Sequence, residues 1–272
     1  MYSASDRGLH VLIRKLERLA PLSYEERQAV EGLPLTVRAL TARQDIVREG
    51  DRPAQCCLML DGWTYRYKLL GGGGRQILSF HLPGDVPDLQ NLHLPVTDHS
   101  LCTLTDATVG FLPHEAVQAL TARFPRIAAL LWRETLIEAG IFRAWMTGMG
   151  RRVAFARIAH LFCELYVKLE AVGLADDHRC PIPLRQTDFA DALGLTSVHV
   201  NRVLQEMRAK RLITLRQRTL VIHDWDGLVT AAEFDPAYLH QVAPAPESGC
   251  AASNQPPFPA AILSLNGAAH VC

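Results

Sequence analysis

Residues 186–213, which read QTDFADALGLTSVHVNRVLQEMRAKRLI, hold side chains suited to contact with the edges of base pairs. On a helix that starts after Thr196, one face carries hydroxyl, amide and guanidinium groups and a single apolar side chain. These residues are Ser197, Val198, Asn201, Arg202 and Gln205. The opposite face is apolar and consists of Val200, Val203, Leu204 and Met207. We therefore expect this helix to enter the major groove of DNA.

The segment before that helix has the pattern of a shorter helix that would position it. Phe189, Ala190 and Leu193 recur at i, i+1 and i+4, so they share one apolar face. Gly194 can take a positive φ and turn the chain, and Thr196 can cap the next helix through its hydroxyl. The pattern predicts a helix-turn-helix, with an ordinary αα-hairpin in a protein core as the alternative.

Two features favour DNA contact over that alternative. Ala190 is small where the two helices must cross closely. Between Arg185 and Arg218 seven Arg or Lys residues stand against three acids, a local net charge of +4, whereas the whole chain has a net charge of 0. A basic surface confined to one segment is typical of a protein that binds nucleic acid.

The composition is that of a folded protein: 272 residues, 49% hydrophobic and 21% charged, leave room for two domains. No apolar run approaches the roughly 18–20 residues that span a bilayer. The first twenty residues mix charged with apolar side chains and lack a small-residue cleavage site, so no secretory signal is expected. We expect a cytoplasmic location and no membrane partner.

The seven cysteines are scattered, at positions 56, 57, 102, 163, 180, 250 and 272, and no CxxC spacing occurs. This distribution indicates neither a disulfide framework nor a zinc module. His160 and Cys163 would share a helix face, and His178 lies close to Cys180. Packing accounts for the first pair and a loop for the second better than a metal does. No metal site or resident cofactor is predicted.

Short segments of strand-forming residues alternate with turn signals from about residue 35 to residue 112. They are CCLML, WTYRYKLL, RQILSFHL, SLCTLT and ATVGFL. Their length and punctuation predict an antiparallel barrel or roll. Gly71 to Gly74 are expected at a hairpin tip, since no Lys-Ser/Thr follows to make a phosphate loop. Two short helices are expected before the roll, and Ser23 with Glu26 predicts a capping box on the second.

A helix of some 25 residues is expected after Pro125, because apolar residues recur there at three-, four- and seven-residue steps. It is apolar over more of its circumference than one neighbour requires, which indicates contact with its own copy across a two-fold axis. Gly148 and Gly150 are expected to interrupt it as a hinge. Further along, LITLRQRTLVIH predicts a two-stranded wing, and the chain from about residue 241 is expected to be mostly disordered.

A β-roll, a long helix and a winged helix-turn-helix, in that order, resemble the Crp/Fnr family of bacterial transcription regulators. The resemblance covers roughly residues 10–238, and its most specific parts are ILSFHLPGD, GRRVAFARIAHLFCELYVKL and DFADALGLTSVHVNRVLQEMRAKRLI. It implies an α+β fold with an N-terminal antiparallel β-roll (cyclic-nucleotide-binding-like), a long dimerisation helix and a C-terminal winged helix-turn-helix. The expected domains are 1–122 for the N-terminal helices and roll, 123–150 for the dimerisation helix and hinge, 151–238 for DNA binding, and 239–272 for the tail.

The resemblance also implies a homodimer on a pseudo-palindromic operator in double-stranded DNA, with RNA polymerase as a further partner. Arg202 matches the recognition-helix arginine that family members use against guanine, and Asn201 occupies a position that contacts bases in some members. Val198 stands where many members have a glutamate that accepts from cytosine, so we expect a different half-site, with contact to a thymine methyl as one option. Ser197 could reach a base or a phosphate.

Four residues around this helix are better suited to phosphate contacts, which position a protein without specifying sequence. They are Gln186, Thr187, Arg216 and Arg218. Cys180 is a candidate redox site, because Arg179 and Arg185 could lower the pKa of its thiol close to DNA.

The N-terminal half lacks the ligand residues that its resemblance would suggest. Family members that bind cyclic nucleotides hold the phosphate with an arginine, yet no Arg or Lys occurs from Gln76 through Ala122. Asp85 replaces the glutamate after the glycine, and Asp98 falls near the arginine's place, so cAMP or cGMP binding is not expected. No cysteine precedes Cys56, which disfavours an iron–sulfur cluster. Haem, another small effector, and competence without any ligand all stay open.

Enzymatic activity is not expected, because no GxSxG, HExxH or Walker pattern occurs. The alternative interpretation is a ligand-binding regulatory subunit, or an enzyme that uses the β-roll, in which the helix pair is only structural. That alternative leaves the polar helix face and the wing arginines unexplained. The sequence therefore predicts a sequence-specific transcription regulator, able to activate as well as repress.

Overall fold

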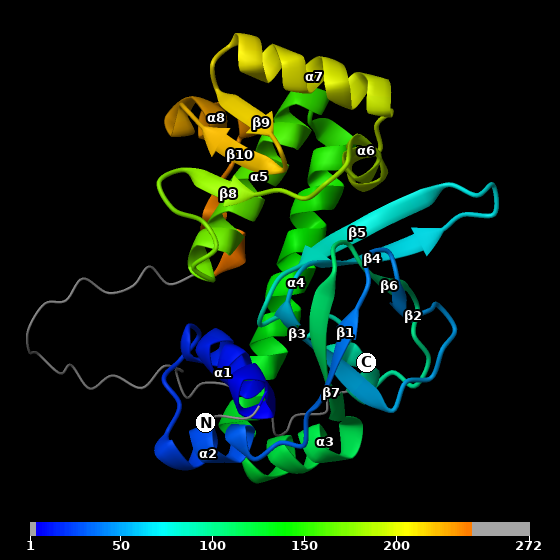
Figure 1. Ribbon diagram of the computed structural model, residues 1–272, viewed down its shortest axis with the longest axis vertical. Coiled ribbons are helices and arrows are strands. Elements are labelled where there is room, and N and C mark those ends of the chain that lie inside the picture. The colour runs from blue at the N-terminus through cyan, green and yellow to red at the C-terminus, as the bar shows by residue number, and fades with distance from the viewer. Residues whose placement is uncertain (1–3, 241–272) are drawn as a thin grey trace, which may run out of the picture. The chain divides into compact units, whose positions relative to one another are not determined.

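Two helices precede the sheets in the computed structural model, which describes residues 4–240 (Figure 1). They are α1 (Ala4–Glu17) and α2 (Tyr24–Glu31). The Glu26 backbone N–H donates to the Ser23 hydroxyl at 3.2 Å, and the Ser23 backbone N–H donates to the Glu26 carboxylate at 2.8 Å. These reciprocal bonds satisfy donors that the first turn of α2 leaves free, and they confirm the predicted capping box.

The N-terminal half is built around two antiparallel sheets. Their strands are β1 (Thr36–Leu40), β2 (Asp45–Val47), β3 (Gln55–Asp61), β4 (Thr64–Leu69), β5 (Arg75–His81), β6 (Ser100–Thr103) and β7 (Ala107–Pro113). One sheet has the order β1-β7-β3 and the other the order β2-β6-β4-β5. A short 3₁₀ helix, η1 (Leu89–Leu92), lies in the long connection between β5 and β6. The predicted antiparallel roll is confirmed.

The glycine run forms the tip of the β4–β5 hairpin, as predicted. The backbone N–H of Leu70 donates to the carbonyl of Gly74 at 2.8 Å, and that of Gly73 donates to the carbonyl of Leu70 at 2.8 Å. Gly73 has a φ of 81°, a conformation that favours glycine. The hairpin brings Arg75 to the first position of β5, where it faces the C-terminal half of the chain.

The helix α3 (His114–Arg123) begins directly after β7. Pro113 directly before it has a φ of −56° and needs no backbone N–H, so it suits the start of a helix.

The long helix α4 (Pro125–Arg151) runs through both glycines that were expected to interrupt it. That prediction was wrong, because a single glycine costs a helix only about 1 kcal/mol and packing outweighs it. The chain leaves the helix at Arg152, whose ψ is 145°. The connection to the next helix therefore lies at residues 152–153 and not at the glycines.

Between residues 152 and 240 the described chain contains four helices, a small sheet and a final 3₁₀ turn. These elements are α5 (Ala154–Ala171), β8 (Arg179–Pro181), α6 (Gln186–Leu193), α7 (Ser197–Ala209), β9 (Ile213–Arg216), β10 (Thr219–Ile222), α8 (Trp225–Ala232) and η2 (Pro236–Leu239). The predicted hairpin is confirmed as β9 and β10, and β8 adds a third strand to give the order β8-β10-β9. β8 was missed because three residues are too few to show an alternating pattern.

One hydrophobic cluster connects the β-roll to the C-terminal half. Phe80 of β5 packs on Trp145 of α4 with ring centroids 5.9 Å apart, and the same cluster continues into α5 through Ile158 and Phe162. No helix within residues 4–240 is long and apolar enough to cross a membrane. The tail that the sequence predicts to be disordered lies outside the described residues.

Candidate nucleic-acid interface

The turn between α6 and α7 fixes the angle of the helix pair. Gly194 has φ 63° and ψ 44°, so it ends α6 in the left-handed conformation that the sequence predicts. The Thr196 hydroxyl accepts from the backbone N–H of His199 at 3.2 Å and caps α7. Gly194 and Thr196 both suit the backbone conformation found at their positions. The turn between α6 and α7 is therefore specified by its local sequence.

Packing holds α7 by its apolar face. Its inward residues are fully buried: Val200, Val203, Leu204 and Met207. Phe189 of α6 contacts Phe162 of α5 edge to face, with ring centroids 5.5 Å apart. Ala190 is buried beside it, as expected of a small residue at a helix crossing. The helix pair therefore rests on α5, and the outward face of α7 stays exposed.

The predicted base-contacting residues lie together on that outward face. Val198 is 81% exposed, Asn201 and Arg202 are exposed, and Ser197 is half-buried. The Arg202 guanidinium lies 3.0 Å from Nε2 of His199, so the imidazole can accept a hydrogen bond from it. His199 thus supports the side chain of Arg202, a role that the sequence pattern did not indicate.

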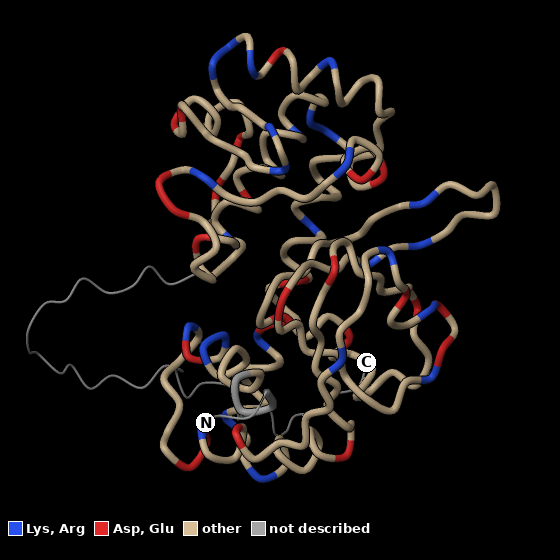
Figure 2. Tube along the Cα trace, viewed as in Figure 1, with Lys and Arg blue, Asp and Glu red and all other residues tan. Residues whose placement is uncertain are grey.

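The predicted phosphate-contacting residues surround the same face. Gln186 and Thr187 are exposed in the first turn of α6, where backbone N–H groups favour anions. Arg216 and Arg218 are exposed at the turn between β9 and β10. Figure 2 shows Lys and Arg along α7 and at this hairpin. Together they present a basic rim to a polyanion.

Cys180 does not have the environment that a reactive thiol needs. It is 2% exposed on β8, and burial raises its pKa to about 12. The expected lowering of this pKa by Arg179 and Arg185 was therefore wrong, because the thiol faces the core and the two cations do not. Burial disfavours the thiolate, which is the form that oxidants attack.

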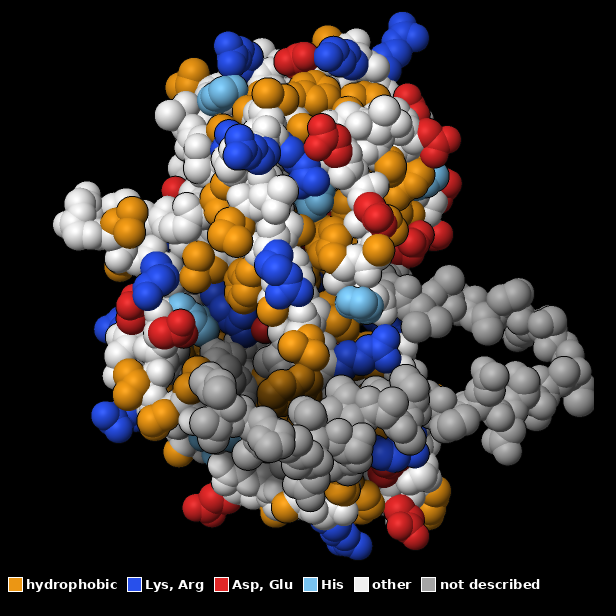
Figure 3. All heavy atoms as spheres, turned by 180° about the vertical axis from the view of Figure 1, so that it is seen from behind, with side chains coloured by type: hydrophobic (Ala, Val, Ile, Leu, Met, Phe, Trp, Pro, Cys, Tyr) orange, Lys and Arg blue, Asp and Glu red, His pale blue; other side chains and the backbone are white. Residues whose placement is uncertain are grey.

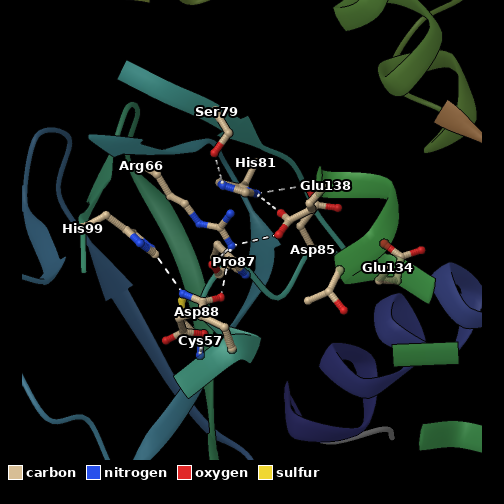
Figure 4. A network of polar contacts seen from close by, with 12 residues as sticks. Cys57, Arg66, Ser79, His81, Asp85, Pro87, Asp88, His99, Glu134 and Glu138 are labelled. Carbon is tan, nitrogen blue, oxygen red and sulfur yellow. Dashed lines mark hydrogen bonds and ion pairs between the residues drawn. The ribbon is translucent and has the colours of Figure 1, made fainter. Parts of the chain in front are cut away.

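A buried polar network fills the β-roll beside α4 (Figure 4). Arg66 of β4 is 3% exposed and donates to the Glu138 carboxylate of α4 at 3.0 Å. His81 of β5 lies 3.4 Å from the same carboxylate. Residues 76–122 contain no Arg or Lys, but Arg66 brings a guanidinium into the interior from an earlier strand. Its contact with Glu138 of α4, which is distant in sequence, shows that Arg66 is a buried cation of the roll.

The acidic residues of the ILSFHLPGD motif and the following loop already have partners within the chain. Asp85 accepts from Lys15 of α1 at 2.8 Å. Burial raises the pKa of Asp85, but Lys15 and Lys168 outweigh burial and hold it below its usual range. Asp88 accepts from the backbone N–H of Cys57 at 2.8 Å, and burial raises its pKa to about 7. Asp85 is thus paired with a cation of the chain itself, whereas Oδ2 of Asp88 is buried without a hydrogen-bond partner.

The cysteines and histidines of the described residues do not converge. Among residues 4–240 no group of three or more His, Cys, Asp or Glu is placed to hold a metal ion. Cys56 and Cys57 are both buried in β3 but belong to different hydrophobic clusters, as expected of neighbours that point to opposite faces of a strand. His160 stacks on Tyr238, with ring centroids 5.8 Å apart.

Comparison with known proteins identifies both halves. The profile of the Crp-like helix-turn-helix domain matches residues 156–231, and that of the cyclic nucleotide-binding domain matches residues 37–124. The nitrogen fixation regulation protein FixK of Bradyrhizobium diazoefficiens is 32% identical over 193 residues, 69% of this chain and 73% of that protein. The transcriptional activator protein FnrA of Stutzerimonas stutzeri is 22% identical over 211 residues, 78% of this chain and 86% of its own length.

A solved structure agrees with these matches. The structure of FixK2 from Bradyrhizobium japonicum aligns with a TM-score of 0.67 and 25% identity, over 73% of this chain and 98% of that one. The chain belongs to the Crp/Fnr family of DNA-binding transcription regulators.

Proposed function

We propose that this regulator acts as a homodimer and places one α7 helix in each of two successive major grooves of a pseudo-palindromic operator. The observation that carries the proposal is the division of α7 into a buried apolar face and an exposed face with base-reading side chains. Two-fold proteins of this kind read half-sites about one helical turn apart.

A partly exposed apolar row on α4 supports the homodimer. The row consists of Trp132 (67% exposed), Leu136 (54%), Phe142 (37%), Met146 (65%) and Met149 (38%). At 3.6 residues per turn the five positions fall within an arc of roughly 140°, so they share one side of the helix. The other side, including Ile137 and Ile141, is buried within the protomer. Apolar side chains gather over α4 in Figure 3. This row would be buried if it packed against α4 of a second protomer.

We assign base contacts to four residues on the exposed face of α7 and phosphate contacts to four residues around it. Arg202 suits guanine, Asn201 suits adenine, and Val198 suits a thymine methyl, with Ser197 at the edge. Gln186, Thr187, Arg216 and Arg218 are exposed donors that can neutralise or hydrogen-bond phosphate oxygens.

We also infer that the protein works in the cytoplasm, with RNA polymerase as a further partner. The relatives support this, since FnrA is named a transcriptional activator. We do not expect a cyclic nucleotide to be the effector, because the buried guanidinium of Arg66 is already paired with the Glu138 carboxylate. The proposed division into domains is 1–122, 123–150, 151–238 and 239–272.

Selection of binding sequences from a randomised duplex pool, at two salt concentrations and without added effector, tests the proposal. The expected product is a palindrome with half-sites about one turn apart. The same selection with Arg202→Ala is expected to return a palindrome degenerate at one position of each half-site. Recovery of no sequence, or of a single asymmetric site, would count against the proposal.

A further inference from the structure

Two arginines of the β-roll contact the first helix of the helix-turn-helix. Arg43, in the turn between β1 and β2, donates two hydrogen bonds of 2.7 Å to the two carboxylate oxygens of Asp188. Arg75, at the start of β5, pairs with Asp191 at 2.7 Å and reaches Asp188 at 3.3 Å. α6 and β5 lie side by side (Figure 1). A parallel two-bond pair fixes orientation as well as distance.

The two arginines are themselves held in place. Tyr65 of β4 lies between them, with its ring centroid 5.7 Å from the Arg43 guanidinium and 5.2 Å from that of Arg75. Its hydroxyl accepts from Arg75 at 2.8 Å. Gln76 adds a hydrogen bond of 3.2 Å to the carbonyl of Ala192 at the end of α6. The contact therefore runs from Asp188 to Ala192 of α6, and Tyr65 of the roll orients the arginines that make it.

The backbone at Arg43 is adapted to this contact. Arg43 has a φ of 66°, a conformation that residues with side chains rarely adopt. Its N–H donates to the carbonyl of Thr103 at 3.0 Å. Such conformations persist where surrounding contacts over-determine them and often mark functional positions. Here the left-handed turn aims the guanidinium at Asp188, which is itself completely buried.

The contact leaves the reading face of the protein open. Asp188 and Asp191 lie on the side of α6 that meets the roll, while Gln186 and Thr187 of the same helix are exposed. The residues of the exposed face of α7 are equally free of the roll. The arginines also neutralise two of the three acids in the basic segment between Arg185 and Arg218. In this arrangement the exposed face of α7 is accessible to DNA, and the charges of Asp188 and Asp191 are neutralised by the arginines of the roll.

We propose that Arg43 and Arg75 are positioning residues: through Asp188 and Asp191 they hold the helix-turn-helix in a DNA-binding orientation and replace a small-molecule effector in that role. This inference rests on the proposed function. The contact would let the roll control the reading helix through the surface that Arg43 and Arg75 present to α6.

The first test is the double variant Arg43→Ala/Arg75→Ala, with Arg38→Ala as its matched control. Arg38 is an exposed arginine of β1 that lies over Phe111 and makes no contact with α6. If the competent orientation falls from nearly all molecules to about a tenth of them, operator affinity falls about 10-fold. The Arg38 variant is expected to bind within about 2-fold of the wild-type protein, since a distant surface charge is largely screened.

A structural readout accompanies the affinity. Hydrogen exchange in residues 186–193 is expected to speed up in the double variant, and small-angle scattering is expected to show a broader distance distribution. The unfolding transition of the roll should stay cooperative. Unchanged exchange and scattering, together with wild-type affinity, would overturn the proposal.

The direction in which Asp191→Ala changes DNA affinity distinguishes a positioning role from a purely electrostatic one. Asp191→Ala removes an acid beside the DNA-binding surface, so a purely electrostatic effect would tighten DNA binding. Positioning predicts weaker binding, because Arg75 loses its 2.7 Å partner. Tighter binding would overturn the proposal. Absence of DNA binding by the wild-type protein would instead count against the proposed function, so the two failures are distinguishable.

Discussion

Arg202 can form directed hydrogen bonds with a base because it stands exposed on α7 with His199 as its polar neighbour at 3.0 Å. Replacement by alanine is expected to remove about 1–3 kcal/mol of discrimination at one base pair in each half-site. Competition binding among duplexes with single base-pair changes measures this loss.

Arg216→Ala provides the matched comparison, because it removes the same charge from the wing. We expect it to weaken binding equally for all sequences and to lower the slope of log affinity against log salt by about 1 per protomer. If both variants lost sequence preference to the same degree, the assignment of Arg202 to a base would be wrong.

His160 predicts a pH dependence of stability. It packs between Phe234 and Tyr238, and burial, with a smaller contribution from Arg152, lowers its pKa to about 4. In the unfolded chain the pKa is about 6.5, so between these values the unfolded state binds more protons. The free energy of unfolding therefore falls as the pH falls from about 6.5 to about 4, by up to about 1.4 kcal/mol per pH unit.

His160→Phe keeps an aromatic ring but removes the titration. Urea unfolding at several pH values should show a shallower acid loss in this variant than in the wild-type protein. Comparison of the two cancels other titrating groups, such as Asp88, whose raised pKa acts in the opposite direction. Identical pH slopes would mean that His160 carries no such effect.

At the scale of elements, alanine substitutions at two glycines are expected to change the free energy of unfolding in opposite directions. Gly150 lies within α4, and apart from the adjoining residues and the helix's own backbone nothing lies within 4 Å of the position that a Cβ would take. Gly150→Ala should therefore stabilise the protein by roughly 0.5–1 kcal/mol. Gly194 has a φ of 63° at the end of α6, so Gly194→Ala should destabilise it by about 1 kcal/mol.

Denaturant unfolding measures both changes, and operator affinity tests their meaning. A Gly150→Ala protein that is folded and stable should bind DNA as the wild type does. If it lost DNA binding, the hinge that the sequence predicts at the glycines would have to be reconsidered.

The elements that the sequence predicted well are those specified by neighbouring residues. The Ser23 capping box, the glycine hairpin tip, Gly194 and the Thr196 cap each depend on a few adjacent positions. The exposed and buried faces of α7 follow from helical periodicity alone.

What the sequence did not show depends on contacts between distant residues. Arg43 meets Asp188 across 145 positions, and Arg66 meets Glu138 across 72. The pKa of Cys180 was misjudged because charges near in sequence do not reveal that the thiol faces the core. Gly148 stays helical because α4 is packed along its length, which outweighs glycine's weak local preference.

At the scale of the molecule, the chain belongs to a family of transcription regulators and not of enzymes, in agreement with the sequence. Its proposed dimer depends on the apolar row of α4. Leu136→Asp places a charge in that row and should give monomers, whereas Leu94→Asp, at another exposed leucine, should not. Sedimentation measures the change. Loss of two-site binding should reduce operator affinity by about 100-fold or more.

A monomeric Leu136→Asp protein that still bound the full palindrome with wild-type affinity would contradict the role of the dimer. So would a variant that stayed dimeric, since the partner would then have to lie elsewhere on the surface.

The most direct measurement is the stoichiometry and footprint of the wild-type protein on its selected operator, without added effector. We predict two protomers per duplex and protection of two major grooves on one face of the DNA, about one helical turn apart. Deletion of one half-site should abolish tight binding. One protomer per duplex, or protection of a single groove with full affinity, would contradict the account.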